Sequence, residues 1–372
     1  MLILLQILLE DNKTETVPES IVKQKCAFIG STIAYIESKN KKPTEDEPST
    51  STQTLSFVGS AYTAALEYKQ YKNDSTSMYT VIGADFNGAI VRQLLMDQEI
   101  DVLNIEIDKK LQTASLLTIE LQEKQKQTKQ NANVTQYNYE ILNKIAFKYL
   151  YPRFKALNGT DSIYADFGIN ENAIKALMTN YGHKLFLQVS DVDYLKKYVD
   201  TLKSYYSDLK LMKKKEHPSL TRFLYLSALE AVNVPQYFCT NKDMYPVNPC
   251  VDAEYVDAQK ILFQNYNKKK HVSYYDYLKQ AKQLPQLLKL MSSLTKSQNI
   301  FIRISDQMIL SSFASGEYAV LVDFQNKISD EAFNARFMHA TVDNKKVQEA
   351  LEIATGQETR VRLIYEDKKN EK

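Results

Sequence analysis

Glycine and proline are scarce in this chain of 372 residues, with nine of each, and tryptophan is missing altogether. Glycine averages about 7% of residues in globular proteins, so nine is well below the usual share. Phosphate-cradling loops, collagen-like repeats and turn-dense all-β sandwiches all need glycine. The shortage therefore argues against these three classes and favours a helix-rich protein.

A strong net charge and a long apolar run are also absent. The chain has 47 basic and 45 acidic residues, a net charge of +2, so no single-sign field acts over the whole molecule. No stretch approaches 18 consecutive apolar residues, which predicts that no segment spans a membrane. Hydrophobic residues make up 44% of the chain, and 25 residues are tyrosines. This composition provides a large core, and tyrosine also favours protein interfaces.

Cysteine occurs at three positions only. Cys26 lies in an apolar segment and is predicted to be buried in the core. Cys239 and Cys250 flank a short loop and can either form a disulfide or remain two reduced thiols. Reduced thiols predict a cytoplasmic location, and a disulfide would predict an extracytoplasmic one. No Cys-x-x-Cys pair is present, so neither a metal site nor a cofactor is predicted.

Apolar residues recur at steps of three and four along much of the chain, which is typical of amphipathic helices. Asn170 is predicted to cap one helix that ends at Gly182, and Ser219 is predicted to cap another. The other predicted helices are 18–37, 54–71, 87–128, 135–157, 190–214, 251–267 and 273–292. A flexible linker is predicted at 38–53 and a short strand at 183–189.

The end of the chain has a different pattern. Strands are predicted at 299–304, 318–324 and 359–365, with helices at 329–340 and 344–355 between the last two. The second of these helices should end at Gly356. The predicted fold class is therefore mainly α: a multi-helix body, which a helical repeat can build, followed by a small α/β domain. The predicted domains are 1–53, an N-terminal helix and linker; 54–297, a helical domain; and 298–372, the α/β domain.

Two segments resemble each other at a spacing of about 57 residues. Tyr198-Val199-Asp200 matches Tyr255-Val256-Asp257, and each is followed by a lysine triplet. Repeated helix pairs stack into arrays that serve as binding surfaces. A chance match between common residues is the alternative.

The strand YAVLVDF and the run VQEALEIATGQETRVRLIYED carry a resemblance to a known family. Residues 310–367 resemble the small K-homology-like domain near the C-terminus of the bacterial clamp-loader gamma/tau subunit. In that family the module mediates protein–protein contacts next to an ATPase. The nearest approach to an ATPase phosphate loop is Gly83–Gly88, but Ala89 and Ile90 follow where lysine and Ser/Thr are needed. The resemblance therefore implies an interaction module without the ATPase.

No catalytic motif is present, and the four histidines are far apart in the sequence. The leading prediction is a non-enzymatic interaction or scaffold protein that binds a protein partner or associates with itself. The alternative is nucleic-acid binding, in which lysines hold phosphates and tyrosines stack on bases. The residues predicted for that role are Lys213, Lys214, Lys215, Lys268, Lys269, Lys270, Tyr274 and Tyr275.

Overall fold

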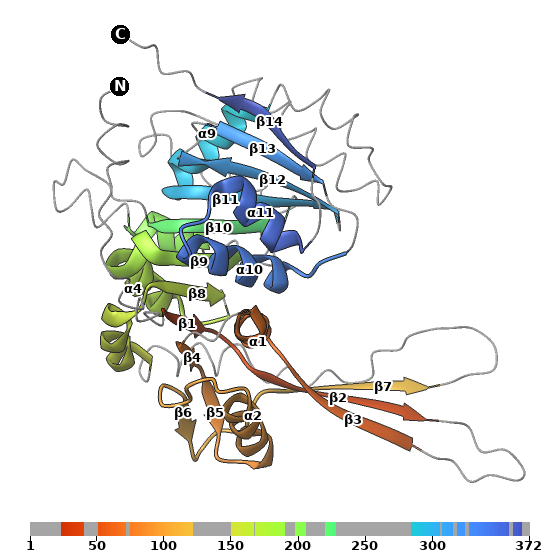
Figure 1. Ribbon diagram of the computed structural model, residues 1–372. Helices are drawn as coiled ribbons and strands as arrows, with labels where there is room; N and C mark the ends of the chain where they lie inside the picture. Colours follow the sequence, from red (N-terminus) through yellow and green to blue (C-terminus); the bar gives the residue numbers. More distant parts are fainter. Residues whose placement is uncertain are drawn as a thin grey trace, which may run out of the picture.

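The computed structural model describes twelve stretches of the chain, in which strands and helices alternate (Figure 1). These stretches are 24–40, 51–71, 75–121, 150–166, 168–189, 198–205, 220–227, 284–305, 307–314, 318–323, 327–356 and 360–366. Their strands form a nine-stranded, a three-stranded and a two-stranded sheet.

The nine-stranded sheet has the order β14-β13-β12-β11-β10-β9-β8-β1-β4. Six neighbouring strands are parallel: β4 (Ser75–Tyr79), β1 (Lys25–Ile29), β8 (Ser162–Asp166), β9 (Leu185–Val189), β10 (Thr221–Ser227) and β11 (Ser297–Ser305). Three antiparallel pairings then add β12 (Met308–Phe313), β13 (Tyr318–Asp323) and β14 (Arg360–Glu366). Parallel strands need helical crossovers, and these cover both faces of the sheet.

One face of the sheet is covered by α1 (Ser60–Tyr71) and α10 (Asp330–Val342), which pack against each other, and α11 (Val347–Thr355) packs on α10. The other face is covered by α4 (Glu171–Tyr181), a helix at 198–205 and α9 (Leu284–Thr295). Two 3₁₀ helices, η1 (Tyr151–Gly159) and η2 (Gly182–Lys184), lie beside α4. We call the first face the α1/α10 face.

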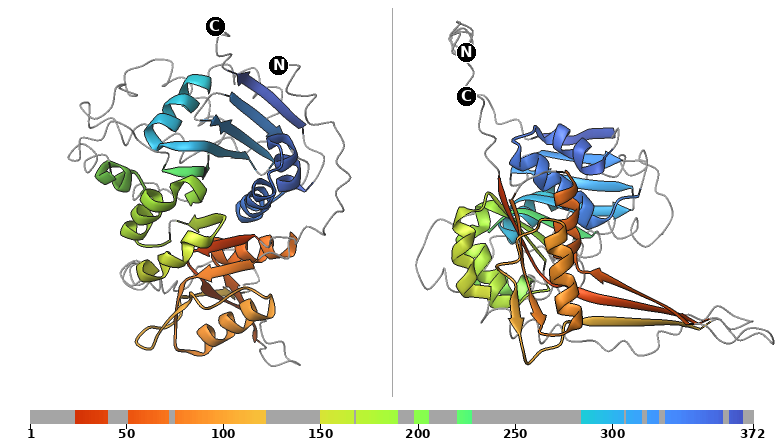
Figure 2. Two further views of the ribbon diagram at one scale, coloured as in Figure 1. Left: turned by 60° about the vertical axis from the view of Figure 1, so that its left-hand side comes forward. Right: turned by 60° about the horizontal axis from the view of Figure 1, so that its bottom comes forward.

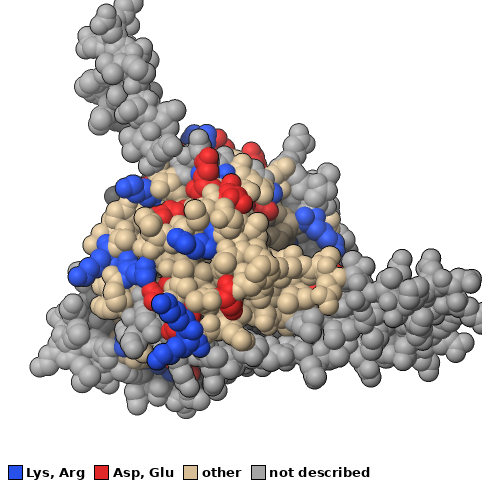
Figure 3. Space-filling view, turned by 90° about the horizontal axis from the view of Figure 1, so that it is seen from below, with Lys and Arg blue, Asp and Glu red and all other residues tan. Residues whose placement is uncertain are grey.

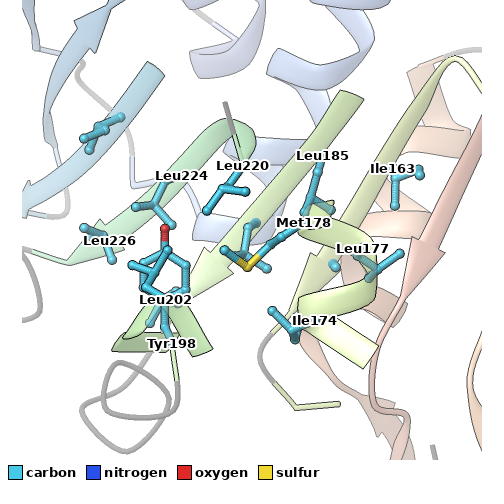
Figure 4. Close-up of a cluster of buried hydrophobic side chains, with 14 of the residues drawn as sticks. Ile163, Ile174, Leu177, Met178, Leu185, Tyr198, Leu202, Leu220, Leu224 and Leu226 are labelled. Carbon is cyan, nitrogen blue, oxygen red and sulfur yellow. The ribbon is translucent and has the colours of Figure 1, made fainter. Parts of the chain in front are cut away.

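Each central strand is buried on both faces, so alternate residues enter two different cores. In β9, Leu185 and Leu187 belong to one core cluster with Leu177 of α4, and Figure 4 shows Leu185 and Leu177 in this cluster. Phe186 points to the α1/α10 face and stacks on Phe223 of β10, with ring centroids 4.4 Å apart. The cores therefore lie above and below a sheet whose strands read as nearly continuous apolar runs.

A small sheet projects from the end of β1 (Figures 1 and 2). Its order is β3 (Ser51–Val58), β2 (Ile33–Asn40) and β7 (Ser115–Leu121), with β2 antiparallel to β3 and parallel to β7. Beside β4 lie α2 (Phe86–Asp97) and the paired strands β5 (Val81–Gly83) and β6 (Glu106–Asp108).

Several predicted helices are wrong. Residues 18–37 contain strands β1 and β2, and 87–128 contains α2 followed by β6 and β7. Residues 54–71 begin as strand and become helix at Ser60, and the chain after Ser219 forms β10. For β1 and β10 the reason is that a strand buried on both faces has no polar alternation, and its apolar residues also satisfy helical spacing.

Other elements agree with the prediction. Asn170 caps α4 through its side chain, which accepts from the N–H of Asn172 at 2.8 Å, and β9 lies within 183–189. The C-terminal order of β13, α10, α11 and β14 is confirmed, and Gly356 ends α11 with φ 68°. Part of 135–157 is the 3₁₀ helix η1, and α9 occupies the end of 273–292.

The predicted fold class, mainly α, is wrong because parallel strands buried on both faces run through the region assigned to a helical body. Strands β11–β14 belong to the same sheet as β1, while the domain boundaries 53 and 297 stay a prediction. The predicted linker 38–53 includes the end of β2 and the start of β3. The second copy of the suggested repeat, from Tyr255, lies outside the described residues. No helix in the described ranges is long and apolar enough to cross a membrane.

Candidate functional site

On the α1/α10 face, a polar side chain lies near the carboxyl end of each of four central strands. Asp166, Gln188, Tyr225 and Arg303 each lie two positions after an aromatic residue of the same strand, and residues two apart share a face. Asp166 pairs with Gln188 in register, and Gln188 pairs with Tyr225. We call these four residues the polar row. It lies at the carboxyl ends of parallel strands, where open α/β sheets bind their ligands.

Helix α10 begins at the polar row. Ser329 is its N-cap, and the Ser329 hydroxyl accepts from the N–H of Ala332 at 3.1 Å. Asp330 in the first turn accepts a 2.6 Å hydrogen bond from the hydroxyl of Tyr225, and Nε of Arg303 lies 3.7 Å from the same carboxylate oxygen. The one guanidinium of the polar row is thus paired with a carboxylate of α10.

Helix α1 begins at the other end of the polar row. Asp166 is 3% exposed and accepts from the N–H groups of Ala61, at 3.1 Å, and Gly168, at 2.7 Å. Burial raises the pKa of Asp166 to about 6, although these hydrogen bonds lower it in part. Asp166 is therefore a buried carboxyl group that binds the first turn of α1.

Two glycines allow the chain to come this close. A Cβ at Gly30 would lie 2.3 Å from Oδ2 of Asp166 and 2.7 Å from Cβ of Ala61. Gly59 has φ +138°, and a Cβ there would lie 2.2 Å from the carbonyl oxygen of Ser31. The end of β1 and the start of α1 can meet at Asp166 only because both positions lack a side chain.

The side chain of Glu331, in the first turn of α10, connects this helix to α1. Its Oε1 accepts from the hydroxyl of Ser60, the first residue of α1, at 3.1 Å, and from Nε2 of Gln188 at 3.2 Å. Oε1 of Gln188 in turn accepts from the hydroxyl of Tyr164 at 2.6 Å and from Nδ2 of Asn334 at 2.9 Å. A carboxylate held in this way at a strand edge is suited to accept a proton from a bound hydroxyl group.

Comparison with known proteins gives a clear result at the level of structure. No protein-family model and no curated protein matches the chain. The ribokinase of Arabidopsis thaliana complexed with ribose and ATP has a TM-score of 0.57 at 14% identity, covering 90% of both chains. The chain shares its fold with this ribokinase.

Further solved structures agree. The ribokinase of Cryptococcus neoformans var. grubii in complex with ADP has a TM-score of 0.55 at 14% identity, covering 89% of this chain and 91% of that chain. A carbohydrate kinase from Agrobacterium tumefaciens has a TM-score of 0.56 at 11% identity, covering 89% and 88%. The likeness thus extends over the body of the chain and is not limited to its C-terminal end.

These likenesses contradict three predictions. The resemblance of residues 310–367 to the clamp-loader domain is wrong, because the chain shares its fold with sugar kinases over nine-tenths of its length. The non-enzymatic scaffold and the nucleic-acid-binding alternative are contradicted, since the similar structures are named as kinases. The lack of a local catalytic motif predicted a non-enzymatic protein, whereas the residues of this candidate site come from elements that are far apart in the sequence.

The other residues predicted for a role are not tested by the structure. Lys213, Lys214, Lys215, Lys268, Lys269, Lys270, Tyr274, Tyr275, Cys239 and Cys250 all lie outside the described residues. Cys26 is buried, as predicted, and its Sγ donates to the hydroxyl of Tyr68 at 3.0 Å.

The segment Gly83–Gly88 forms a closed turn. Asp85 caps α2 by accepting from the N–H of Gly88 at 2.8 Å, and it also accepts from the hydroxyl of Thr113 at 2.7 Å. A Cβ at Gly88 would lie 2.2 Å from the carbonyl oxygen of Gly83. The N–H of Gly88, which a phosphate loop would offer to its ligand, is thus already bound by Asp85.

The sequence does contain a signal for the polar row. In SIYAD, LFLQV, FLYLS and IFIRIS, one polar or hydroxyl-bearing side chain follows an aromatic residue by two positions, so both lie on one face of a strand. Reading 162–166 and 221–227 as strands would have revealed it.

The charges on the described surface are of both signs. Seen from below (Figure 3), the described residues show scattered basic and acidic side chains among uncharged ones. Within the described ranges, no group of three or more His, Cys, Asp or Glu side chains could hold a metal ion.

Proposed function

We propose that this protein is a kinase that transfers a phosphoryl group from a nucleoside triphosphate to a hydroxyl group of a small polyhydroxylated molecule, a sugar or a nucleoside. The fold supports this, since the similar structures include a ribokinase with ribose and ATP and a nucleoside kinase from Methanocaldococcus jannaschii. The observation that carries the proposal is the carboxylate of Glu331, fixed at the carboxyl edge of the parallel strands beside two helix N-termini.

Each part of the site has a role in the proposed reaction. Glu331 accepts the proton of the attacking hydroxyl group, which makes the oxygen a better nucleophile. The N-termini of α1 and α10 supply N–H groups and positive dipole ends that favour a phosphate. Arg303 offsets the charge of Asp330, which otherwise repels phosphate oxygens.

Magnesium ions accompany nucleoside triphosphates and usually bind one or two carboxylates together with the phosphates. Asp330 and Glu331 are carboxylates of the right type for such a shared site. Such an ion would come to the site together with the nucleotide. Nucleoside triphosphates are cytoplasmic metabolites, so the cytoplasmic location predicted from the sequence belongs to this proposal.

The test is a kinase assay on the purified protein with ATP or GTP, Mg²⁺ and a panel of pentoses, hexoses and nucleosides. We expect substrate-dependent formation of nucleoside diphosphate. Glu331→Gln should lower kcat about a hundredfold or more, since general base catalysis contributes roughly 10²–10⁴. Glu171→Gln is the matched control, because Glu171 also lies in the first turn of a helix but on the other face of the sheet. Absence of turnover with every acceptor, or full activity of Glu331→Gln, would refute the proposal.

A further inference from the structure

Five polar side chains from four elements form one continuous hydrogen-bonded chain on the α1/α10 face. Tyr164 of β8 and Asn334 of α10 both donate to Gln188 of β9. Gln188 donates to the carboxylate of Glu331, and Ser60 of α1 donates to the same carboxylate. All four contacts lie between 2.6 and 3.2 Å.

Within this chain the amide of Gln188 has one satisfactory orientation. Its Oε1 faces two donors, and its Nε2 faces an ionised carboxylate, which can only accept. If the amide were reversed, Oε1 would face the negative charge of Glu331, and Nε2 would face the amide nitrogen of Asn334. The donors behind Gln188 thus direct its N–H group at Glu331.

Burial keeps water away from the hydrogen bonds that hold the Gln188 amide in this orientation. Tyr164 is fully buried, Gln188 is 1% exposed and Asn334 is 4% exposed, so water cannot replace a lost partner. Burial also raises the pKa of Tyr164 well above its ordinary value, with a further rise from the nearby carboxylate of Glu331. The Tyr164 hydroxyl therefore keeps its proton and remains a donor.

The hydrogen bonds leave one oxygen of Glu331 available. The bonds from Ser60 and Gln188 both end on Oε1, and Oε2 accepts none from the described residues. One oxygen is therefore fixed by the fold, and the other can meet a substrate. This division is what a general base needs, because its geometry must be set before the substrate arrives.

We propose that Gln188 is a positioning residue that orients the Glu331 carboxylate, and that Tyr164 and Asn334 keep the Gln188 amide in the required orientation. The catalytic part of this inference rests on the proposed function. The structural part, in which the Gln188 amide depends on Glu331, can be tested without any substrate.

The substrate-free test uses the side-chain amide signals of Gln188 in ¹⁵N NMR spectra of the full chain, assigned by their loss in Gln188→Met. In Glu331→Met, which has no acceptor, we expect these signals to shift and broaden because Nε2 has lost its partner. Tyr164→Phe should shift them less, since Asn334 still holds Oε1. Unchanged Gln188 signals in Glu331→Met would overturn the inference.

Tyr198→Phe is the matched control for Tyr164→Phe. Tyr198 is also fully buried and donates its hydroxyl to the carbonyl oxygen of Thr295 at 3.2 Å, but it lies on the opposite face of the sheet. It should lower stability to a similar degree and leave the Gln188 signals unchanged. An equal shift in both variants would mean that the signals report general loosening, and the inference would fail.

The kinetic test uses the acceptor found in the kinase assay. Gln188→Met should lower kcat by about tenfold to a hundredfold, the usual cost of a misplaced catalytic group, with KM little changed. If Gln188→Met does not fold, Tyr164→Phe supplies the same measurement with a smaller loss. If Glu331→Gln inactivates the enzyme but Gln188→Met leaves kcat unchanged, the positioning role is refuted and the proposed function is not. NMR coupling in a protein without kinase activity would instead refute the proposed function.

Discussion

Helices α1 and α2 both begin with backbone N–H groups bound by a carboxylate, but the two carboxylates come from different places. Asp85 directly precedes α2 and accepts from the N–H of Gly88, three residues later. Asp166 is 105 residues away from Ala61 of α1, whose N–H it accepts. The start of α2 is therefore encoded locally, and the start of α1 depends on a strand that folds against it.

The two carboxylates also titrate differently. Desolvation raises the pKa of Asp85, but hydrogen bonds from Thr113 and Gly88 outweigh it and lower the pKa overall. For Asp166 burial prevails and raises the pKa to about 6. The charge on Asp85 stabilises the fold, whereas the charge on Asp166 costs stability. Carboxyl groups with raised pKa values cluster at functional sites, which fits the place of Asp166 in the polar row.

The largest expected effect comes from Gly59, whose backbone conformation distinguishes the start of α1 from the start of α2. Gly59→Ala should destabilise the protein by about 4 kcal/mol, because overpacking costs roughly 1–3 kcal/mol and a conformation reserved for glycine costs about as much again. Gly88→Ala should cost about 2 kcal/mol, because its Cβ only overpacks against Gly83. Urea unfolding at pH 7 measures both.

Gly159→Ala is the control for both glycines, since nothing lies within 4 Å of a Cβ there. It should change the free energy of unfolding by less than about 0.5 kcal/mol. Equal losses for Gly59→Ala and Gly88→Ala would show that the conformation of Gly59 adds nothing to the overpacking.

The next effect is the pH dependence that comes from Asp166. Because its folded-state pKa is raised from 3.8 to about 6, its contribution to stability is fully present below pH 4 and is lost as pH rises to 6. At about 1.4 kcal/mol per pKa unit, this loss is about 3 kcal/mol. Urea unfolding from pH 4 to 7 should show the loss in the native protein and not in Asp166→Asn. Parallel curves for the two proteins would contradict it.

Asp85 should show the opposite dependence. Its lowered pKa means that its contribution is present above the ordinary value of 3.8 and is lost as pH falls further. Asp85→Ala should cost about 2 kcal/mol at pH 7, from the lost cap and the lost bonds to Thr113. The difference between variant and native protein should narrow as the pH is lowered through 3.8. A stability difference between Asp85→Ala and the native protein that does not change with pH would contradict the opposite pH dependence predicted for Asp85 and Asp166.

The smallest effect concerns α10, whose start combines a local and a distant contact. Tyr225→Phe removes the hydroxyl that donates to Asp330 and should cost about 1 kcal/mol, measured as a fall in Tm. In an Asp330→Ala background the same change should cost less, because the partner is already gone. An equal fall in Tm in the Asp330→Ala background would show that the Tyr225 hydroxyl stabilises the protein through a group other than Asp330.

The sequence predicted the fold well at its end and poorly in its first half. Helices 329–340 and 344–355 and strands 318–324 and 359–365 were confirmed because each begins or ends at a clear local signal, such as Ser329 or Gly356. Strands β1, β8 and β10 were missed, since a short apolar run does not distinguish a buried strand from a helix. With the strands missed, the polar row at their ends could not be recognised.

By itself the sequence determined the helix ends whose partners lie within a turn, including the Asn170 cap of α4 and the Gly356 end of α11. It also placed polar residues two positions after aromatic ones. Only the tertiary structure decided that Asp166 meets Ala61 and that Gln188 meets Glu331, because these hydrogen bonds join residues more than 100 positions apart. Contacts of that range depend on which strands pair, and pairing is decided by burial of the whole sheet.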